Sequence, residues 1–333
     1  MKLNENFDQL IKKEKRKRLL KTIAISFVTT VVLLFIGFTL INKRMEMQYK
    51  KAQEMANITD MIESPNLVSQ SQYLSTSGRV TSQLKSERFK NIDGYMVAAT
   101  PLEINFSLFG IGYGSGKNSS LTVPITKTKE IGAFSRENGE KLPLFFNPKH
   151  KESETQQEAK ETHEARTLSG FKNHVAEVAI SFKKPMTYDE IQAKIPENVL
   201  INWYWLGMAS DQLSATETVG KVIGINADET GKLSSESLKS KTSSAWWSPN
   251  YPSFVAAVKT AAEKRGYTVN GLDIYQDALK QIEKYPTLKT AKFSGIIVSG
   301  RTENLATLDD ESYVYTTNVG LQAEILPYIE PTK

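Results

Sequence analysis

The glycine-rich stretch Gly110–Ser119 is the part of the sequence that most resembles a phosphate-binding loop. A phosphate loop needs a glycine six positions before its lysine, and a serine or threonine directly after the lysine. Lys117 has Ile111 at the first of these positions and Asn118 at the second. A dinucleotide fingerprint also fails, because Ser115 or Lys117 replaces its third glycine. The stretch therefore predicts a loop between strands, not a nucleotide site.

Side chains that could bind a metal or act as nucleophiles are few. The sequence has no cysteine, and the spacing of His150, His163 and His174 matches no metal site. The run Asp309-Asp310-Glu311 could bind a cation or form a solvated turn. A Ser–His–Asp set cannot be argued without geometry. We therefore expect no catalytic residue, no cofactor and no metal, and we expect that the protein is not an enzyme.

The tryptophans offer a second kind of chemistry, which is stacking on a ligand. All four lie in two short segments, Trp203-Tyr204-Trp205 and Trp246-Trp247. In a strand, Trp203 and Trp205 share one face and Tyr204 points to the other. Two interpretations remain open: these aromatic side chains pack in a core, or they form a surface that stacks on glycan or lipid.

The segment Thr22–Ile41 predicts a transmembrane helix. It contains no charged residue over a length that matches the hydrocarbon core of a bilayer. A cleaved signal peptide has a shorter apolar region that ends in a small-x-small site, and no such site follows Ile41. We therefore expect an uncleaved signal anchor that crosses the cell membrane once.

The distribution of charge predicts the orientation of this anchor. The net charge of +5 arises in residues 1–21, since the rest of the chain carries equal numbers of basic and acidic side chains. Seven basic residues lie between Lys12 and Lys21, on the N-terminal side of the span. The positive-inside rule therefore predicts a cytoplasmic N-terminus and an extracellular C-terminus. Because the residues after the tail carry no surplus positive charge, we do not expect them to bind nucleic acid.

The basic tail has one apolar face, formed by Leu3, Phe7, Leu10 and Ile11 at helical spacing. This face could lie on the inner leaflet of the lipid bilayer, with the lysines on anionic headgroups. It could instead bind a cytoplasmic partner.

The remaining sequence predicts an α+β fold in which the transmembrane helix precedes a β-rich region and an α+β C-terminal domain. Residues 42–148 begin with a polar helix and continue as short alternating strands, residues 149–167 form a polar linker or exposed loop, and residues 168–328 mix strands and helices. Thr187 with Glu190, Ser253 and Asp273 are predicted helix caps.

Several stretches resemble a family of membrane-anchored sigma-factor regulators of Gram-positive bacteria. The C-terminal domain of that family is similar to Glu177–Ile191, Asn202–Gly207, Tyr251–Phe254 and Phe293–Gly300. Its N-terminal domain is similar to this chain where Phe7–Lys17 runs directly into the span. The motifs are structural, and the similarity covers most of the chain.

The resemblance implies an anti-sigma factor, or a protein that acts with one, which holds an extracytoplasmic-function sigma factor inactive until envelope stress. It implies a sigma factor or a companion anti-sigma membrane protein as the partner, and an extracellular sensing domain. Anti-sigma proteins generally use a larger cytoplasmic domain than residues 1–21. The tail could act with a second protein, the true start could lie upstream, or only the sensory half could be kept. The alternative function is an envelope ligand-binding or structural protein without a role in transcription.

Overall fold

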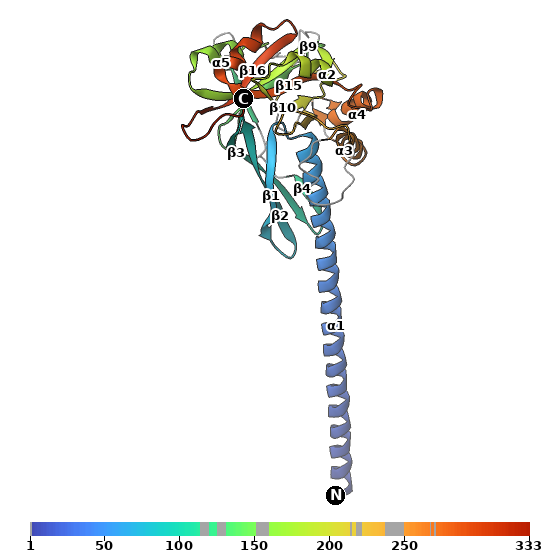
Figure 1. Cartoon of the computed structure of the whole chain (residues 1–333). Helices are drawn as coiled ribbons and strands as arrows, with labels where there is room; N and C mark the ends of the chain where they lie inside the picture. The colour runs from blue at the N-terminus through green and yellow to red at the C-terminus, as the bar shows by residue number, and fades with distance from the viewer. Residues whose placement is uncertain are drawn as a thin grey trace.

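One helix dominates the computed structural model, which describes residues 2–113, 120–124, 131–150, 160–213, 215–217, 222–236, 250–266, 268–269 and 271–333. Helix α1 runs without a break from Lys2 to Ile62 and projects far beyond the folded body (Figure 1). Its 61 residues span roughly 90 Å at 1.5 Å per residue. The predicted tail, span and polar helix are therefore three parts of one rod.

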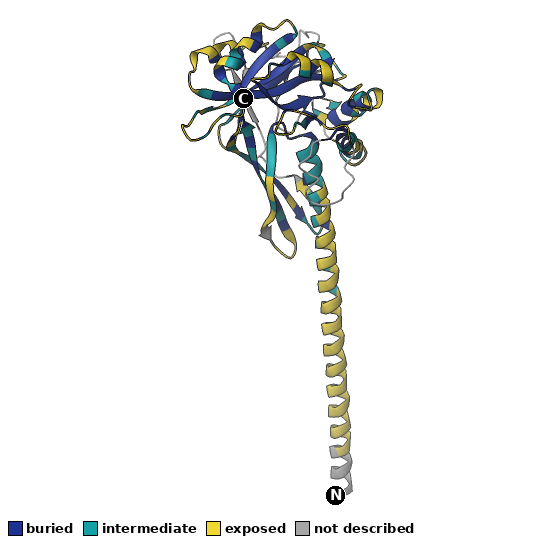
Figure 2. Ribbon diagram, viewed as in Figure 1, coloured by how far each residue is buried: buried dark blue, intermediate teal, exposed yellow. Residues whose placement is uncertain are grey.

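The middle of α1 has the character of a membrane span. Among the described residues, this is the one helix long and apolar enough to cross a bilayer. Large apolar side chains such as Phe27, Leu34 and Phe35 are exposed on all sides of this segment. In the folded body, by contrast, many residues are buried (Figure 2). A helix that is apolar on every face needs a lipid or protein environment. The chain is therefore a membrane-anchored protein.

Four antiparallel strands follow the helix in the order β1-β2-β3-β4. Their bounds are Leu67–Ser77, Thr81–Ile92, Tyr95–Ser107 and Gly110–Tyr113. Alternate side chains of β2 are buried, because one face of this sheet packs on the C-terminal part of α1. The side chains in this contact include Ala52, Ala56, Leu84, Ile104 and Phe106.

The glycine-rich stretch differs in part from its prediction as a loop. Gly110–Tyr113 is strand β4, whose backbone pairs with Ile104–Ser107 of β3. A tight turn at Leu108-Phe109 reverses the chain and brings the two strands into register. The rest of the predicted loop, residues 114–119, lies outside the described residues.

The C-terminal part is built on a five-stranded antiparallel sheet with the order β12-β10-β15-β9-β16. These strands are Gly224–Asn226, Leu200–Trp205, Lys292–Arg301, His174–Thr187 and Val314–Glu324. Four helices pack into its main core, namely α2 (Tyr188–Lys194), α3 (Tyr251–Lys264), α4 (Ile274–Lys284) and α5 (Thr302–Ala306). The architecture is α+β, as the sequence predicts.

Smaller elements complete the body. Short strands are β5 (Ser120–Pro124), β6 (Ile131–Ser135), β7 (Lys141–Leu142), β8 (Leu144–Phe146), β11 (Ala215–Glu217), β13 (Thr268–Val269) and β14 (Leu272–Asp273). The 3-10 helices η1 and η3 cover Ala165–Gly170 and Thr307–Asp310.

Two of the three predicted caps are present. Thr187 and Glu190 form a reciprocal capping box at α2, and the Asp273 carboxylate accepts hydrogen bonds from the first turn of α4. The prediction of Ser253 as the cap of α3 is wrong. Asn250 caps this helix and accepts the Ser253 N–H at 2.9 Å, with Pro252 in the first turn, a position that suits proline.

Residues before and within the predicted linker, residues 149–167, pack with the C-terminal domain in the structure. Phe145 of β8 stacks on Trp205 of β10 at 4.6 Å between ring centroids, so a strand before the predicted linker belongs to the C-terminal core. In the linker itself, residues 160–167 are described, and Thr162 and Ala165 are buried there. Thr162 Oγ1 donates to the Thr317 carbonyl at 2.9 Å. This stretch is therefore part of the body.

Candidate coupling site at the C-terminal end of the membrane helix

The tryptophans of β10 are core residues. Trp203 and Trp205 are 0% and 1% exposed, because Phe145 packs against both rings. Tyr204 on the opposite face is also buried, and its hydroxyl donates to the Gly231 carbonyl at 2.8 Å. The prediction of a stacking surface is wrong for Trp203 and Trp205. Its other two residues, Trp246 and Trp247, lie outside the described residues.

The predicted partner-binding face lies at the opposite end of the molecule, in the first turns of α1 (Figure 1). Leu10 and Ile11 are 60% and 39% exposed. The side chains of Leu3 and Phe7 are outside the described part, but the continuous helix gives all four residues the spacing of one face. Partner binding by this face stays a prediction.

Asp309, which belongs to the predicted solvated turn or cation site, is buried among protein partners. Its carboxylate accepts hydrogen bonds from Thr317 Oγ1 at 2.5 Å and Arg166 Nε at 2.6 Å, and His163 Nδ1 lies 3.1 Å away. Burial acts to raise its pKa, but the hydrogen bonds from Thr317 and Arg166 hold the pKa of Asp309 below its usual value. Asp309 thus fastens η3 to β16.

In the described part of the chain, no three His, Cys, Asp or Glu side chains lie together as a metal site. A hollow of about 380 Å³ opens beside β2, β3 and β4, and its lining includes Thr81, Gln83, Asn105 and Ser107. The lining has no acidic or basic side chain, so the hollow does not suit acid–base chemistry.

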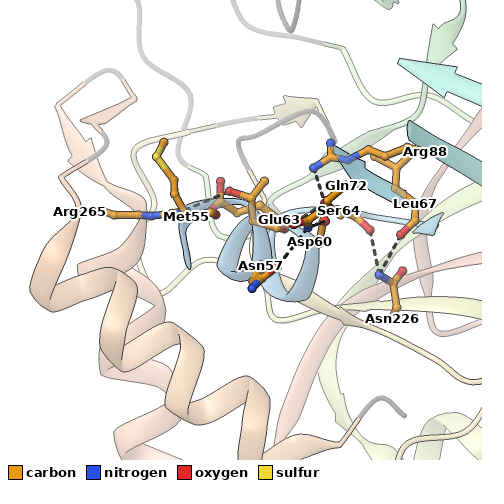
Figure 3. A network of polar contacts seen from close by, with 11 residues as sticks. Met55, Asn57, Asp60, Glu63, Ser64, Leu67, Gln72, Arg88, Asn226 and Arg265 are labelled. Carbon is orange, nitrogen blue, oxygen red and sulfur yellow. Dashed lines mark hydrogen bonds and ion pairs between the residues drawn. The ribbon is translucent and has the colours of Figure 1, made fainter. Parts of the chain in front are cut away.

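A group of polar contacts joins the last turns of α1 to the C-terminal half. Arg265, directly after α3, lies against the end of α1 (Figure 3). Its guanidinium contacts Glu63 Oε1 at 2.9 Å and Thr59 Oγ1 at 3.2 Å, and it also donates to the Met55 carbonyl. Tyr275 of α4 donates its hydroxyl to the same Glu63 oxygen at 2.7 Å.

Electrostatics explains why an arginine is needed here. The C-terminus of a helix carries a partial negative charge, and a glutamate beside it adds repulsion. The side chains of Glu63 and Arg265 are each only 8% exposed, so water contributes little screening. Burial raises the pKa of Glu63, while the Arg265 charge and the Tyr275 hydroxyl act to lower it. Arg265 therefore places a buried positive charge beside Glu63 and the last turns of α1.

A second group of contacts ties the same turns to the strands. Arg88 of β2 donates to Asp60 Oδ1 at 2.6 Å, and Gln72 of β1 donates to Asn57 Oδ1 at 3.1 Å (Figure 3). Asn226 of β12 donates to the Ser64 carbonyl at 3.1 Å, just after the helix ends. Both sheets are thus attached to the last turns of α1 or to the residues directly after them.

Two further contacts connect the sheets themselves. Lys90 of β2 lies fully buried between Glu177 of β9 and Glu140. Burial acts to lower the pKa of Lys90, but the charges of Glu177 and Glu140 raise it above its usual value. Asn66 Nδ2 also donates to Glu177 Oε2 at 2.9 Å. The ammonium group is therefore held charged at the contact between the two sheets.

The second contact is the β2–β3 turn, where Asp93 has a left-handed backbone with φ of 55°. Its N–H donates to Ser299 Oγ at 2.9 Å, and its Oδ1 accepts the Lys333 N–H at 2.9 Å. Burial raises the pKa of Asp93 to about 6.

Local sequence patterns do not reveal this site. Lys264-Arg265-Gly266 predicts a helix stop, but the Arg265–Glu63 contact joins residues 202 positions apart. A weak signal exists in the residues Asp60 and Glu63, which are acidic at the end of a helix where basic residues are favoured. Such a pattern indicates that a cation comes from elsewhere in the fold.

Two protein-family models match the chain, and the contacts at the end of α1 join residues of both matched regions. The model described as sigma factor regulator N-terminal matches residues 8–97, and the model described as sigma factor regulator C-terminal matches residues 168–321. Together they cover well over half of the chain. Comparison with curated proteins and with solved structures gives no match. The end of α1 belongs to the first matched region, and Arg265, Tyr275 and Asn226 belong to the second.

Proposed function

The chain belongs to the sigma factor regulator family and regulates the activity of a sigma factor, and we propose that it does so across the membrane. In this proposal residues 1–21 lie in the cytoplasm, α1 crosses the bilayer, and the body lies outside the cell as a sensing domain. The protein acts as an anti-sigma factor or together with one, and it performs no catalysis.

The unbroken course of α1 is the observation that supports this proposal most. The same helix carries the basic tail, the apolar span and the turns held by Arg265 and Arg88. A rigid helix attached at its outer end gives the body a fixed relation to the tail. A signal that changes the assembly or the proteolysis of the body would thereby change what the tail presents inside the cell.

In this proposal the apolar face of the tail forms the contact with a partner inside the cell. Leu3, Phe7, Leu10 and Ile11 bind the sigma factor or a companion anti-sigma membrane protein, and the lysines that follow lie on anionic lipid. A buried aromatic anchor of this kind often contributes about 2 kcal/mol or more to binding, which is roughly thirtyfold in affinity.

Reporter fusions test the orientation. An enzyme that is active only outside the cytoplasm, fused after Lys333, should be active, and one that works only in the cytoplasm should be inactive there. The same two enzymes fused before Met1 should show the opposite pattern. A cytoplasmic C-terminus would exclude an external sensing domain.

A pull-down from solubilised membranes tests whether the apolar face of the tail binds a partner. The full chain should retain a sigma factor or a companion protein, and Phe7→Ala/Ile11→Ala should lose it. The matched control neutralises Lys15–Arg18 and leaves the apolar face intact. Binding that survives the apolar variant but fails in the charge variant would exclude docking through this face.

A further inference from the structure

Two loop tips at one end of the first sheet carry exposed apolar side chains. Phe109, in the β3–β4 turn, is 94% exposed, and Val80, in the β1–β2 turn, is 52% exposed. The Leu108 N–H donates to the Val80 carbonyl at 3.1 Å, so the two tips are joined. They lie at the end of the sheet that points along α1 toward the N-terminus (Figure 1).

Contacts with α1 place these tips at the level of the membrane surface. The Arg79 guanidinium lies over the Phe38 ring at 5.2 Å, and Phe38 is within the uncharged segment that ends at Ile41. Arg44 Nε donates to the Leu108 carbonyl at 3.1 Å. Both tips therefore contact the last turn of the span or the turn directly after it.

The dimensions of a bilayer decide what surrounds these residues. Arg44 follows Ile41 by three positions, which is a rise of roughly 4.5 Å along the helix. The headgroup layer is about 5–8 Å thick on each side of the hydrocarbon core. Leu108 and Phe109 therefore lie within the headgroup layer, and Arg79 lies near its inner boundary.

We propose that the two tips, Gly78–Val80 and Leu108–Phe109, bind the phospholipid surface and form a second membrane contact beside α1. The proposal rests on the membrane anchoring of the chain and not on the orientation or on the sigma-factor partner. Phe109 and Val80 enter the interface, where aromatic and apolar groups are favoured. Arg79 and Arg44 offer guanidinium groups to lipid phosphate oxygens.

The tips fit a lipid surface better than a protein partner because they are continuous with the span. The residue that Arg79 covers, Phe38, is itself exposed to the bilayer, so lipid is the first medium that the tip meets. The contact also has a consequence for signalling. Together with α1, the tips give the body a second point of contact with the membrane. This second contact prevents the body from tilting freely about the helix.

Single-cysteine labelling of the full chain in phospholipid vesicles tests the proposal. The natural sequence has no cysteine, so each variant carries one spin label at a known place. The test site is Phe109→Cys. The matched control is Tyr328→Cys, an aromatic position 80% exposed in the C-terminal segment, and Leu34→Cys reports the span itself. Collision with dissolved oxygen and with a water-soluble nickel complex measures the depth of each label.

The Phe109→Cys label should lie within about 10 Å of the boundary between headgroups and acyl chains, with the Tyr328→Cys label in water and the Leu34→Cys label in lipid. A Phe109→Cys label that is as accessible to nickel as the Tyr328→Cys label overturns the membrane contact while anchoring by α1 stands. A label shielded from both reagents overturns it in favour of a protein partner. A Leu34→Cys label in water would contradict the anchor itself.

Discussion

At the scale of single residues, the buried pair of Glu63 and Arg265 carries the attachment of the membrane helix. Desolvation makes such a pair a weak source of net stability, but the loss of one partner leaves an uncompensated charge inside the protein. The neighbouring pair of Lys264 and Glu54 joins the same two helices, with side chains 58% and 48% exposed. The two pairs therefore offer a matched comparison of buried and exposed contacts.

We expect Arg265→Ala to lower the free energy of unfolding by about 3–5 kcal/mol, because Glu63 stays buried without its cation. Lys264→Ala should lower it by less than about 1 kcal/mol, as is usual for an exposed pair. Urea unfolding of the detergent-solubilised chain, followed by tryptophan fluorescence, measures both values. Equal effects of the two substitutions would contradict the assignment of Arg265 as the principal contact.

Asp93 predicts a dependence of stability on pH. Its folded pKa of about 6 lies above the ordinary value of 3.8, so the folded state binds a proton that the unfolded state releases. Its contribution to stability therefore falls as the pH rises from about 4 to about 6 and is constant above that. Asp93→Asn removes the charge, keeps an oxygen for the Lys333 N–H, and tolerates the positive φ.

We expect Asp93→Asn to stabilise the protein at pH 8 by on the order of 1–3 kcal/mol. The gain should shrink as the pH is lowered through 6. Thermal unfolding at several pH values measures it, with Asp310→Asn at an exposed position as the control. A gain that does not change with pH would show that the Asp93 charge is not its cause.

At the scale of elements, α1 acts as a rod only if its helix is unbroken between span and body. Lys43 is exposed and lies just beyond the span. Lys43→Pro removes a helical hydrogen bond and should kink α1 by more than about 20°. Lys43→Ala loses the same charge but keeps the helix.

Spin labels at Leu34→Cys and Leu74→Cys, on opposite sides of this position, should report the kink. In vesicles the distance distribution between them should stay narrow with Lys43→Ala, and it should shift and broaden with Lys43→Pro. If both variants give the same distance distribution as the parent chain, the continuity of α1 does not fix the body relative to the span.

The sequence predicts elements well where the signal is local. The apolar span, the capping box of Thr187 and Glu190, and the Asp273 cap depend on neighbouring residues, and the structure contains all three. The Trp203 and Trp205 environment depends on Phe145, which is distant in sequence and covers the second face of β10. The run Leu200–Trp205 is apolar on both faces except at Asn202, and this lack of alternation was the available signal for a fully buried strand.

At the scale of the whole molecule, the two matched family regions form one interlocked body at the end of a membrane helix. Long-range partners such as Lys90 with Glu177, and Arg265 with Glu63, join them. Local patterns cannot predict such pairs, because any of the many acidic side chains could have been the partner. The candidate coupling site therefore became visible only in the folded chain.

Transcription from a promoter that depends on the partner sigma factor tests whether this chain holds that sigma factor inactive. We expect transcription to rise several-fold in cells that lack this chain. Expression of the full chain should reverse the rise, and Phe7→Ala/Ile11→Ala, present in the membrane at the same level, should not. Transcription that stays the same with and without the chain would contradict a membrane-anchored regulator that holds its sigma factor inactive.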